Sequence, residues 1–509
     1  MLSRVKSSAV IGVDATVVEV EVDVSPGLPF FATVGLPEAA VRESRERVRA
    51  ALENSGYEFP EDRIVVNLAP AHLKKEGTGF DLPMAMGILA STGEIPPDRL
   101  HGLLILGELS LDGRVKPVRG SLPMALAAKG EGIRTIAVPE ANASEAAVVE
   151  GVEVLPVSHI SQLVEFLRTG MGLDPRRPDP ARVFAARDAD GVDFSEVRGQ
   201  EHVKRALLVA CAGGHNVLMV GPPGSGKTML AKRLPTILPE LAFEEALDTT
   251  KVWSVAGLLS ADRPLVTRRP FRSPHHTISD AGLIGGGVHP RPGEVSLAHH
   301  GVLFLDELPE FKKHVLEVLR QPLEDGQVTI SRAAISLTYP ASFMLVAAMT
   351  PCPCGYLSDP RHECRCHPRE IATYRNRISG PLLDRLDIQI EVPAVAYKDL
   401  SADGGGEPSS SFRQKVAEAR KIQAERFAGQ GFLANARMGN RHVKKFCRPD
   451  EAGHKILETA VDRLGLSARA YHRVLKIART VADLAASPEI RAPHVAEAVQ
   501  YRTLERKSG

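Results

Sequence analysis

Apolar and polar residues alternate along the first third of the chain, a pattern that predicts strands with one buried face. The clearest alternation is ATVVEVEVDV at residues 15–24, and RIVVNLA, GLLILGEL and TIAVPE have the composition of further strands. Between them, PEAAVRESRERVRAALENSG and FDLPMAMGILASTG have the length and spacing of helices. This mixture of strands and helices predicts an α+β or α/β domain.

Breaks in the pattern divide the rest of the chain. A stretch rich in Pro, Arg and Asp follows the helical segment SQLVEFLRTG and is typical of a linker, and SADGGGEPSSS indicates a flexible connection. Beyond that connection the pattern is helical throughout. The predicted segments are a first domain at 1–169, a linker at 170–193, an α/β core at 194–396, a flexible linker at 397–411 and a helical domain at 412–509.

An apolar strand runs into a glycine-rich loop and then a helix in VLMVGPPGSGKTML. In this context the spacing G-x-x-x-x-G-K-T predicts a phosphate-binding P-loop. Glycine lets backbone N–H groups converge on phosphate oxygens, and the helix N-terminus adds a partial positive charge. We expect Lys227 to reach the β- and γ-phosphates and the Thr228 hydroxyl to bind Mg²⁺. The predicted nucleotide-binding residues of the loop are Gly221, Pro222, Pro223, Gly224, Ser225, Gly226, Lys227 and Thr228.

A second apolar strand, VLFL, ends in two acidic residues within HHGVLFLDELPEF. In P-loop proteins an acidic residue at this place holds Mg²⁺. We expect Asp306 to do so and Glu307 to polarise the attacking water. For the pair taken alone, an acidic strand cap is the alternative. Together with the P-loop, the pair predicts an ATPase whose cofactors are ATP and Mg²⁺.

Composition narrows the choice of partners only slightly. The net charge is +1, so any contact with nucleic acid has to come from local basic patches. No apolar run approaches the ~20 residues of a membrane-spanning helix. The N-terminal segment does not have the pattern of a signal peptide. We therefore expect a cytoplasmic protein without membrane contact.

Four of the six cysteines lie within residues 352–366, in CPCGYLSDPRHECRC. In a reducing compartment, clustered cysteines favour a metal over disulfide bonds. Four thiolates can close a tetrahedral Zn²⁺ site, which would be structural because no coordination position stays open. Free reduced thiols and a redox role are the alternatives. The predicted metal ligands are Cys352, Cys354, Cys364 and Cys366 for Zn²⁺, with Thr228 and Asp306 for Mg²⁺.

Further motifs resemble AAA+ ATPases, in particular the clade that holds magnesium chelatase and the MCM replicative helicases. Thr350, after the strand FMLVAAM, stands where these ATPases carry a polar "sensor 1" residue, although we expect asparagine there in this clade. GPLLDRLDIQIEVP resembles their arginine-finger segment, in which Arg385 would act on the ATP of a neighbouring subunit. SARAYHRVLKIARTVADL resembles their sensor 2 helix, with Arg469 or, second, Arg473 as the sensor. The resemblance implies an α/β AAA+ P-loop core with a helical lid, assembled as an ATP-dependent homo-hexamer.

The first domain resembles the Lon-protease-type domain in GELSLDGRVKPVRG and KKEGTGFDLPMAMGILASTG. This resemblance implies an α+β fold of the Lon-like (ribosomal S5 domain 2-like) type. The catalytic pair of that family is missing, since no serine occurs between Ser55 and Ser91. Leu122, Pro123 and Met124 occupy the stretch where the lysine is expected. A Ser–Lys nucleophile cannot form from these residues, so we expect no peptidase activity.

An inactive Lon-like domain, a chelatase-type core and paired C-x-C motifs together resemble the magnesium-chelatase-like family of bacterial competence-related ATPases over essentially the whole chain. That resemblance implies a hexameric, ATP-driven branch-migration helicase that acts on recombination intermediates during natural transformation. One alternative is a protein remodeller that binds a protein partner through the Lon-like domain. The other is the motor subunit of a magnesium-chelatase-type metal-insertion complex.

Two segments are candidate contacts with single-stranded or branched DNA. QVTISRAAISLTYP predicts a β-hairpin with Arg332 near its tip, where it would contact phosphate; a purely structural hairpin is the alternative. VTRRPFRSPHHTISDAGLIGGGVHPRPGE is rich in Arg, His and Gly. There Arg272, His275 and His276 would follow a phosphate backbone. Phe271 would stack on a base.

The cysteine segment joins the strand before Thr350 to the segment that carries Arg385. We therefore hypothesise that a zinc site fixes the approach of the arginine finger to the adjacent subunit. Projection of basic residues towards DNA is the alternative.

Overall fold

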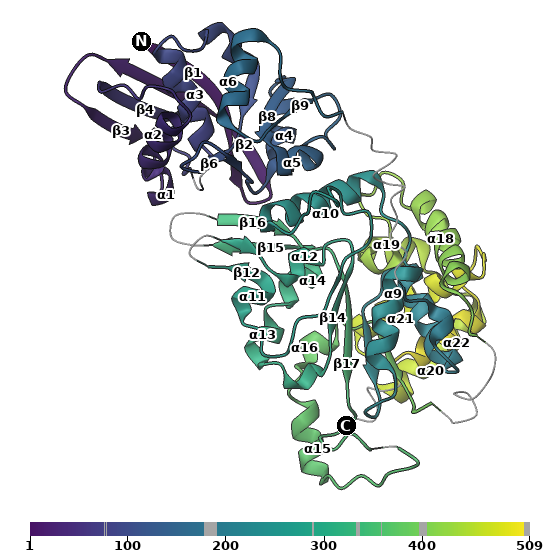
Figure 1. Cartoon of the computed structure of the whole chain (residues 1–509). Coiled ribbons are helices and arrows are strands. Elements are labelled where there is room, and N and C mark those ends of the chain that lie inside the picture. Colours follow the sequence, from purple (N-terminus) through teal and green to yellow (C-terminus); the bar gives the residue numbers. More distant parts are fainter. Residues whose placement is uncertain are drawn as a thin grey trace. The chain divides into compact units, whose positions relative to one another are not determined.

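Figure 1 shows the computed structural model, which describes residues 1–75, 77, 79–177, 191–287, 290–331, 336–357, 359–395 and 405–502. The chain forms two compact units. The first comprises Met1–Arg187, Phe243–Thr267 and Ser331–Tyr339, and the second comprises Asp188–Ala242, Arg268–Ile330 and Pro340–Gly509. Two segments that the sequence analysis placed within 194–396 therefore belong to the first unit.

A seven-stranded mixed sheet forms the centre of the first unit, in the order β3-β4-β2-β1-β5-β8-β9. Its strands are β1 (Leu2–Ile11), β2 (Asp14–Ser25), β3 (Phe30–Val34), β4 (Arg63–Ala69), β5 (Leu103–Ile105), β8 (Thr135–Pro139) and β9 (Glu153–Val157). β1 and β2 form an antiparallel hairpin, whereas β5, β8 and β9 run parallel. The alternation predicted for residues 15–24 is confirmed in β2, where Val18, Val20 and Val22 are fully buried and the glutamates between them are half-buried.

Seven helices belong to the described part of the first unit. They are α1 (Ala39–Arg42), α2 (Ser44–Asn54), α3 (Asp81–Ser91), α4 (Ser121–Gly130), α5 (Glu140–Ala146), α6 (Ile160–Thr169) and α10 (Phe243–Ala256). Every residue of α3 is buried, and its first residue, Asp81, accepts hydrogen bonds from Ser44 Oγ at 2.6 Å and Arg47 Nε at 2.7 Å. The helix dipole and these charge-assisted bonds stabilise the buried carboxylate. α10 joins this unit through the Ser254 hydroxyl, which donates to the buried carboxylate of Glu145 in α5.

A five-stranded parallel sheet forms the centre of the second unit, in the order β11-β14-β17-β10-β18. Its strands are β10 (Val217–Val220), β11 (Phe271–Arg272), β14 (Val302–Leu305), β17 (Met344–Met349) and β18 (Ile388–Glu391). β14 and β17 lie side by side (Figure 1) and are buried along their whole length. Such continuous apolar runs are typical of parallel strands that are covered on both faces.

Seven of the described helices of the second unit pack into one core with this sheet. They are α8 (Glu201–Gly213), α9 (Lys227–Ile237), α18 (Ser409–Arg426), α19 (Asn440–Phe446), α20 (Glu451–Leu464), α21 (Ala468–Leu484) and α22 (Ala492–Gln500). Val474 and Ile477 of α21 belong to the same buried cluster as Val217 of β10 and Leu207 of α8. The helical C-terminal segment is thus part of the unit that carries the P-loop.

Short elements connect the larger ones. They are β6 (Glu108–Leu109), β7 (Val115–Lys116), α11 (Asp280–Ile284), β12 (Gly285–Gly286), β13 (Arg291–Pro292), α12 (Glu294–Leu297), α13 (Lys313–Glu317), α14 (Arg320–Asp325), β15 (Gln327–Ser331), β16 (Ser336–Pro340), α15 (Pro368–Arg375), α16 (Gly380–Leu383) and 3₁₀ turns at Pro97–Leu100, Phe194–Glu196, Leu308–Glu310 and Asn435–Arg437. β15 and β16 pair as the predicted hairpin, but Arg332 between them lies outside the described residues. Among the described helices, none combines the length and the apolar composition needed to cross a bilayer.

Candidate nucleotide-binding site

The carboxyl edge of the second unit's sheet brings three sequence-distant motifs together. The P-loop follows β10, Asp306 and Glu307 follow β14, and Thr350 follows β17. β17 pairs with both β10 and β14, and all three strands run in the same direction. Their carboxyl ends therefore meet at one edge, which is where open α/β sheets bind their ligands.

The backbone of the P-loop requires glycine at three positions. Gly224 and Gly226 have φ angles of 73° and 89°, in the left-handed region. A Cβ on Gly221 would lie 2.1 Å from the carbonyl oxygen of Val392, so only glycine fits there. Gly226 directly precedes α9, and no side chain caps that helix. The N–H groups at the start of α9 are thus available to an anion such as phosphate.

Lys227 is held by its own loop. Its Nζ donates to the carbonyl oxygens of Gly221 and Pro222, both at 2.8 Å, and to Ser225 Oγ at 3.2 Å. Burial lowers the pKa of this ammonium group, an effect that the nearby Asp306 carboxylate opposes. Phosphate oxygens are stronger acceptors for an ammonium than neutral carbonyls. The lysine can therefore exchange these partners for a nucleotide.

Thr228 and Asp306 are in direct contact at the same edge. Thr228 Oγ1 donates to Asp306 Oδ2 at 2.6 Å. The other carboxylate oxygen of Asp306 accepts from the backbone N–H of Glu307 at 3.0 Å. Oxygen atoms of this kind are the ligands that Mg²⁺ takes beside nucleotide phosphates. The structure thus brings together the two residues that we predicted as Mg²⁺ ligands, and they fit that ion.

Glu307 has an uncommon backbone conformation and a partner that the sequence analysis missed. Its φ is 52°, which is rare outside glycine and often marks functional positions. Its side chain is 64% exposed, and Oε2 lies 3.3 Å from His276 Nδ1. The His276 ring packs beside His275, with centroids 4.1 Å apart. We assigned His276 to DNA, but it lies beside the predicted catalytic glutamate because it follows β11 at the same carboxyl edge.

Two other predicted DNA contacts are engaged inside the second unit. The Phe271 ring is stacked on Phe304, with centroids 6.0 Å apart, and packs against the hydrophobic core. The Arg272 guanidinium group binds both carboxylate oxygens of Glu294, at 2.6 and 2.7 Å. Both side chains thus have partners within the chain. The DNA contacts that we expect for Phe271, Arg272, His275 and His276 stay predictions.

Thr350 lies in a small hydrogen-bonded network. Its Oγ1 donates to the carbonyl oxygen of Cys352 at 3.0 Å and lies 2.8 Å from the Tyr374 hydroxyl. Burial raises the pKa of Tyr374, so this phenol stays protonated and can donate to Thr350. Tyr374 belongs to α15, and no motif in the sequence marks it as a partner of Thr350.

The four-cysteine site, formed by Cys352, Cys354, Cys364 and Cys366, occupies the loop between β17 and α15. Its sulfur atoms all lie within 4.8 Å of one another. Three of the Sγ–Sγ distances are 3.4, 3.7 and 3.6 Å, and all four cysteines are free of disulfide bonds. Tetrahedral zinc with bonds of ~2.3 Å places its sulfur ligands ~3.8 Å apart. The residues present therefore fit such an ion.

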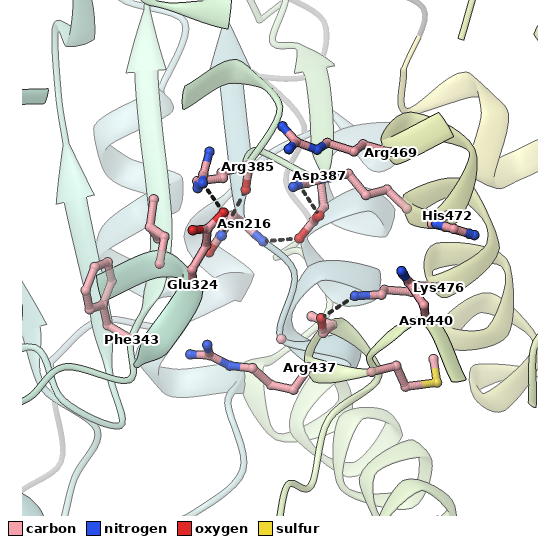
Figure 2. A pocket seen from close by; sticks show the side chains of 15 residues that line it. Asn216, Glu324, Phe343, Arg385, Asp387, Arg437, Asn440, Arg469, His472 and Lys476 are labelled. Carbon is pink, nitrogen blue, oxygen red and sulfur yellow. Dashed lines mark hydrogen bonds and ion pairs between the residues drawn. The ribbon is translucent and has the colours of Figure 1, made fainter. Parts of the chain in front are cut away.

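The amino edge of the same sheet carries a cluster of cations. A cavity of about 330 Å³ lies there, lined in part by Asn216 just before β10 and Phe343 just before β17 (Figure 2). Its charged lining residues are Arg385, Arg437, Arg469, Arg473, Lys476, Glu324 and Asp387. Five cations face two carboxylates, so the cavity suits an anionic group. We refer to it as the cationic cavity.

The predicted arginine finger and the predicted sensor 2 residue both line the cationic cavity. Arg385 is buried, donates to the Pro381 carbonyl oxygen at 2.7 Å and forms an ion pair with Glu324. Arg469 is 73% exposed and lies 3.8 Å from the Asp384 carboxylate. Both arginines are therefore at the edge of the sheet opposite to the P-loop of their own chain.

Arg473, our second choice for sensor 2, has a different environment. Its Nη1 donates to Asp387 Oδ1 at 2.7 Å. Burial opposes ionisation of Asp387, but the charge of Arg473 and a contact with His215 outweigh it, so the pKa of Asp387 is well below its usual range. Arg473 is thus committed to an internal ion pair, whereas Arg469 is accessible.

Strand order and loop chemistry together define the class: the second unit is a P-loop core of the AAA+ type. Comparison with known proteins identifies the family in three segments. Residues 193–400 match the family described as magnesium chelatase, subunit ChlI. Residues 20–142 match one described as subunit ChlI of Mg-chelatase, and residues 406–502 match the ChlI C-terminal family.

Individual relatives narrow this result. The chain is 44% identical to competence protein ComM of Haemophilus influenzae, over 99% of this chain and 98% of that protein. It is 43% identical to YifB of Escherichia coli over the same shares. The chloroplastic magnesium-chelatase subunit ChlI of Chlamydomonas reinhardtii is 25% identical over 50% of this chain and 63% of that protein. The chain therefore belongs to the magnesium-chelatase-like family of AAA+ proteins, in the branch of ComM and YifB. Membership implies ATP and Mg²⁺ as ligands of the site.

Proposed function

We propose that the protein is an ATP-hydrolysing DNA motor. It works as a ring of six identical subunits and moves the branch point of recombination intermediates during natural transformation. Support comes from a relative that is similar over the whole chain and is named a competence protein. The motifs that resemble the competence-related ATPases support the same function.

The observation that carries the proposal is the division of charged residues between two edges of one sheet. Lys227, Thr228 and Asp306 lie at the carboxyl edge, and Arg385 and Arg469 lie at the amino edge. β10 has 4 residues, and a strand rises about 3.3 Å per residue, so the edges are ~13 Å apart. The arginines are thus a strand length away from the P-loop of their own chain.

Such a division favours head-to-tail assembly. If the cationic cavity of one subunit faces the nucleotide of the next, each subunit uses both of its edges. Repeated heterologous contacts of this kind close into a ring. Arg385 is oriented by Glu324 and the Pro381 carbonyl, and in such a ring it would neutralise charge on the phosphoryl group transferred in the neighbouring subunit.

Each residue at the carboxyl edge has a separate role in ATP hydrolysis. Lys227 binds the β- and γ-phosphates, and Thr228 and Asp306 hold the Mg²⁺ of the nucleotide. Glu307 accepts a hydrogen bond from the attacking water and polarises it. Thr350 orients that water through its hydroxyl, in place of the asparagine that we expect in this clade. The ion neutralises phosphate charge when it is bound.

The proposal also assigns roles to the first unit, the four-cysteine site and the residues that contact DNA. We infer that the first unit is a Lon-like domain without peptidase activity: Leu122 is fully buried and offers no polar side chain where a catalytic lysine would stand. A structural Zn²⁺ fills the four-cysteine site. DNA is contacted through His275 and Arg332.

A second candidate function is the motor of a metal-insertion complex, which the ChlI description of the matched families favours. The similarity to a named chelatase subunit covers only half of this chain, whereas ComM is similar over all of it. Metallation of a porphyrin in the presence of partner subunits would support this candidate. Protein remodelling through the first unit is the third, and no feature of the described residues favours it.

The test is branch migration of a synthetic four-way DNA junction with ATP and Mg²⁺. Wild type is compared with Glu307→Gln and with Glu131→Gln, an exposed acidic residue of the first unit. We expect product from wild type and from Glu131→Gln only, and hydrolysis that is lower by about 10²-fold or more in Glu307→Gln, because general-base catalysis contributes that much. Hydrolysis by wild type that no DNA stimulates, with no junction product, would refute the DNA motor.

A further inference from the structure

The four-cysteine site lies in direct contact with two parts of the nucleotide site. The Cys352 carbonyl oxygen accepts the hydroxyl of Thr350 at 3.0 Å. In the same loop, Gly355 packs against the P-loop: a Cβ there would lie 2.7 Å from Pro223 Cδ and 3.6 Å from Thr350 Cγ2. The loop that carries the first two cysteines therefore touches both the sensor residue and the P-loop.

The sulfur atoms are arranged as ligands rather than as packed thiols. Besides their mutual distances, two backbone N–H groups point at sulfur: Leu357 N lies 3.4 Å from Cys352 Sγ, and Cys354 N lies 3.3 Å from Cys366 Sγ. Such donors stabilise thiolate and orient metal ligands. Cys352 is fully buried, and an ion bound there would tie residues 352–354 to residues 364–366. Without an ion, four thiolates this close together repel one another.

We infer that the four-cysteine site binds one thiophilic divalent cation of the zinc class and thereby holds Thr350 and Pro223 in place, so that metal occupancy controls the nucleotide site of the same subunit. This inference rests on the proposed ATPase function. Cys352 lies two residues after Thr350, so a shift of the loop displaces the hydroxyl that Cys352 and Tyr374 position.

Our hypothesis from the sequence, that the site fixes the approach of the arginine finger to the adjacent subunit, stays a prediction, because the described contacts of both groups lie within one chain. The contacts described for the Arg385 side chain are with Pro381 and Glu324, at the amino edge of the sheet. The four-cysteine loop follows β17 and lies at the carboxyl edge. Its described polar contacts run to α15 as well, since Arg375 Nε donates to the Pro351 carbonyl oxygen at 3.2 Å.

The first experiment measures metal content, nucleotide affinity and DNA-free ATP hydrolysis of the full-length chain. Cys354→Ala is compared with Cys447→Ala, a matched substitution at an isolated, buried cysteine of the second unit. We expect about one zinc ion per chain in wild type and Cys447→Ala. In Cys354→Ala we expect little zinc, and nucleotide affinity and turnover lower by about tenfold, the usual size of such positioning effects. Thermal melting checks that the variants are folded.

A second variant separates metal binding from its effect on the P-loop. Gly355→Ala keeps all four thiolates but places a methyl group against Pro223, at a backbone with φ 87°. We expect it to retain zinc and to bind nucleotide more weakly than wild type. Wild type without zinc, or zinc-free protein with unchanged nucleotide affinity and turnover, would overturn the inference. Because no DNA is present, failure of the DNA-motor proposal would leave these readouts unchanged.

Discussion

The two edges of the second unit's sheet differ in the charge of their side chains and in the ligand that each edge can bind. At the carboxyl edge, Asp306 lies near the ammonium of Lys227, and the Thr228 hydroxyl, which donates to Asp306, completes a place for Mg²⁺. At the amino edge, arginines outnumber carboxylates around the cationic cavity. The carboxyl edge suits a nucleotide with its metal ion. The amino edge has more cations than carboxylates and therefore suits a further anion from outside the chain.

The edges also differ in how tightly their residues are held. The carboxyl-edge residues contact one another across motifs, as Thr228 does with Asp306. The amino-edge arginines are tied to carboxylates, Arg385 to Glu324 and Arg473 to Asp387. A cation that is already oriented loses less entropy when it binds phosphate, so Arg385, which Glu324 and the Pro381 carbonyl orient, is suited to a neighbouring subunit's nucleotide.

The sharpest test of this comparison mixes two inactive variants, Arg385→Ala and Glu307→Gln. Each alone should hydrolyse ATP about 10²-fold or more slowly than wild type, since each lacks one catalytic group. In a head-to-tail ring, the cationic cavity of a Glu307→Gln subunit meets the intact P-loop of an Arg385→Ala subunit. At equal concentrations about one interface in four is then complete, so about a quarter of wild-type ATPase activity should return.

The control for this mixture uses Arg168→Ala, an exposed arginine of the first unit that pairs with Glu94. It should be active alone, and mixing it with Glu307→Gln should only dilute its activity. Mixtures of Arg385→Ala and Glu307→Gln that stay inactive, although both variants assemble and melt like wild type, would show that the two edges do not meet between subunits.

The two candidate sensor 2 residues provide a smaller effect that refines the amino edge. Arg469→Ala should lower ATP hydrolysis by about tenfold, which corresponds to the loss of one charge-assisted hydrogen bond of ~1.5 kcal/mol. Its melting temperature should not change, because Arg469 is 73% exposed. Arg473→Ala removes the guanidinium partner of the buried Asp387 carboxylate, which should reduce the free energy of unfolding by about 3 kcal/mol.

Steady-state ATPase assays and urea unfolding distinguish these outcomes, with both variants measured side by side. An Arg469→Ala variant with wild-type turnover, together with an Arg473→Ala variant that folds normally but is inactive, would make Arg473 the sensor. The cationic cavity would then act on the nucleotide through Arg473, which pairs with Asp387, rather than through the exposed Arg469.

The sequence predicts the individual motifs of this site better than it predicts the contacts between residues that are distant in the chain. The strand–loop–helix around Lys227, the acidic pair after VLFL and the alternation in β2 depend on residues close together in the chain, and the structure has these elements where the pattern predicts them. The contacts of His276 with Glu307 and of Tyr374 with Thr350 depend on strand order, which no local pattern encodes. The same is true of Phe271, whose ring covers Phe304 only because β11 pairs with β14.

Strand pairing also explains why the functional residues appear at two edges rather than at one site. Asn216 precedes β10 and Asp387 precedes β18, and the backbone N–H of Asn216 donates to Asp387 Oδ2 at 3.1 Å. Sequence motifs place arginines near Asp387 but do not show on which side of the sheet they lie. That side becomes clear only from the parallel pairing of β10 with β18.

The smallest expected effect concerns the carboxyl edge and tests whether His276 of the same chain positions Glu307. His276→Ala removes the ring nitrogen that lies 3.3 Å from Glu307 Oε2. If His276 positions Glu307, kcat for ATP hydrolysis without DNA should fall by about threefold with little change in KM, as expected for one hydrogen bond of ~0.7 kcal/mol. His276→Asn, which keeps a donor near Nδ1, should restore most of the lost kcat.

The control is His275→Ala. The described polar contact of His275 is with Thr277, so this variant should leave DNA-free turnover unchanged. Equal turnover in wild type and His276→Ala would show that His276 does not position Glu307, so the 3.3 Å contact would have no part in hydrolysis.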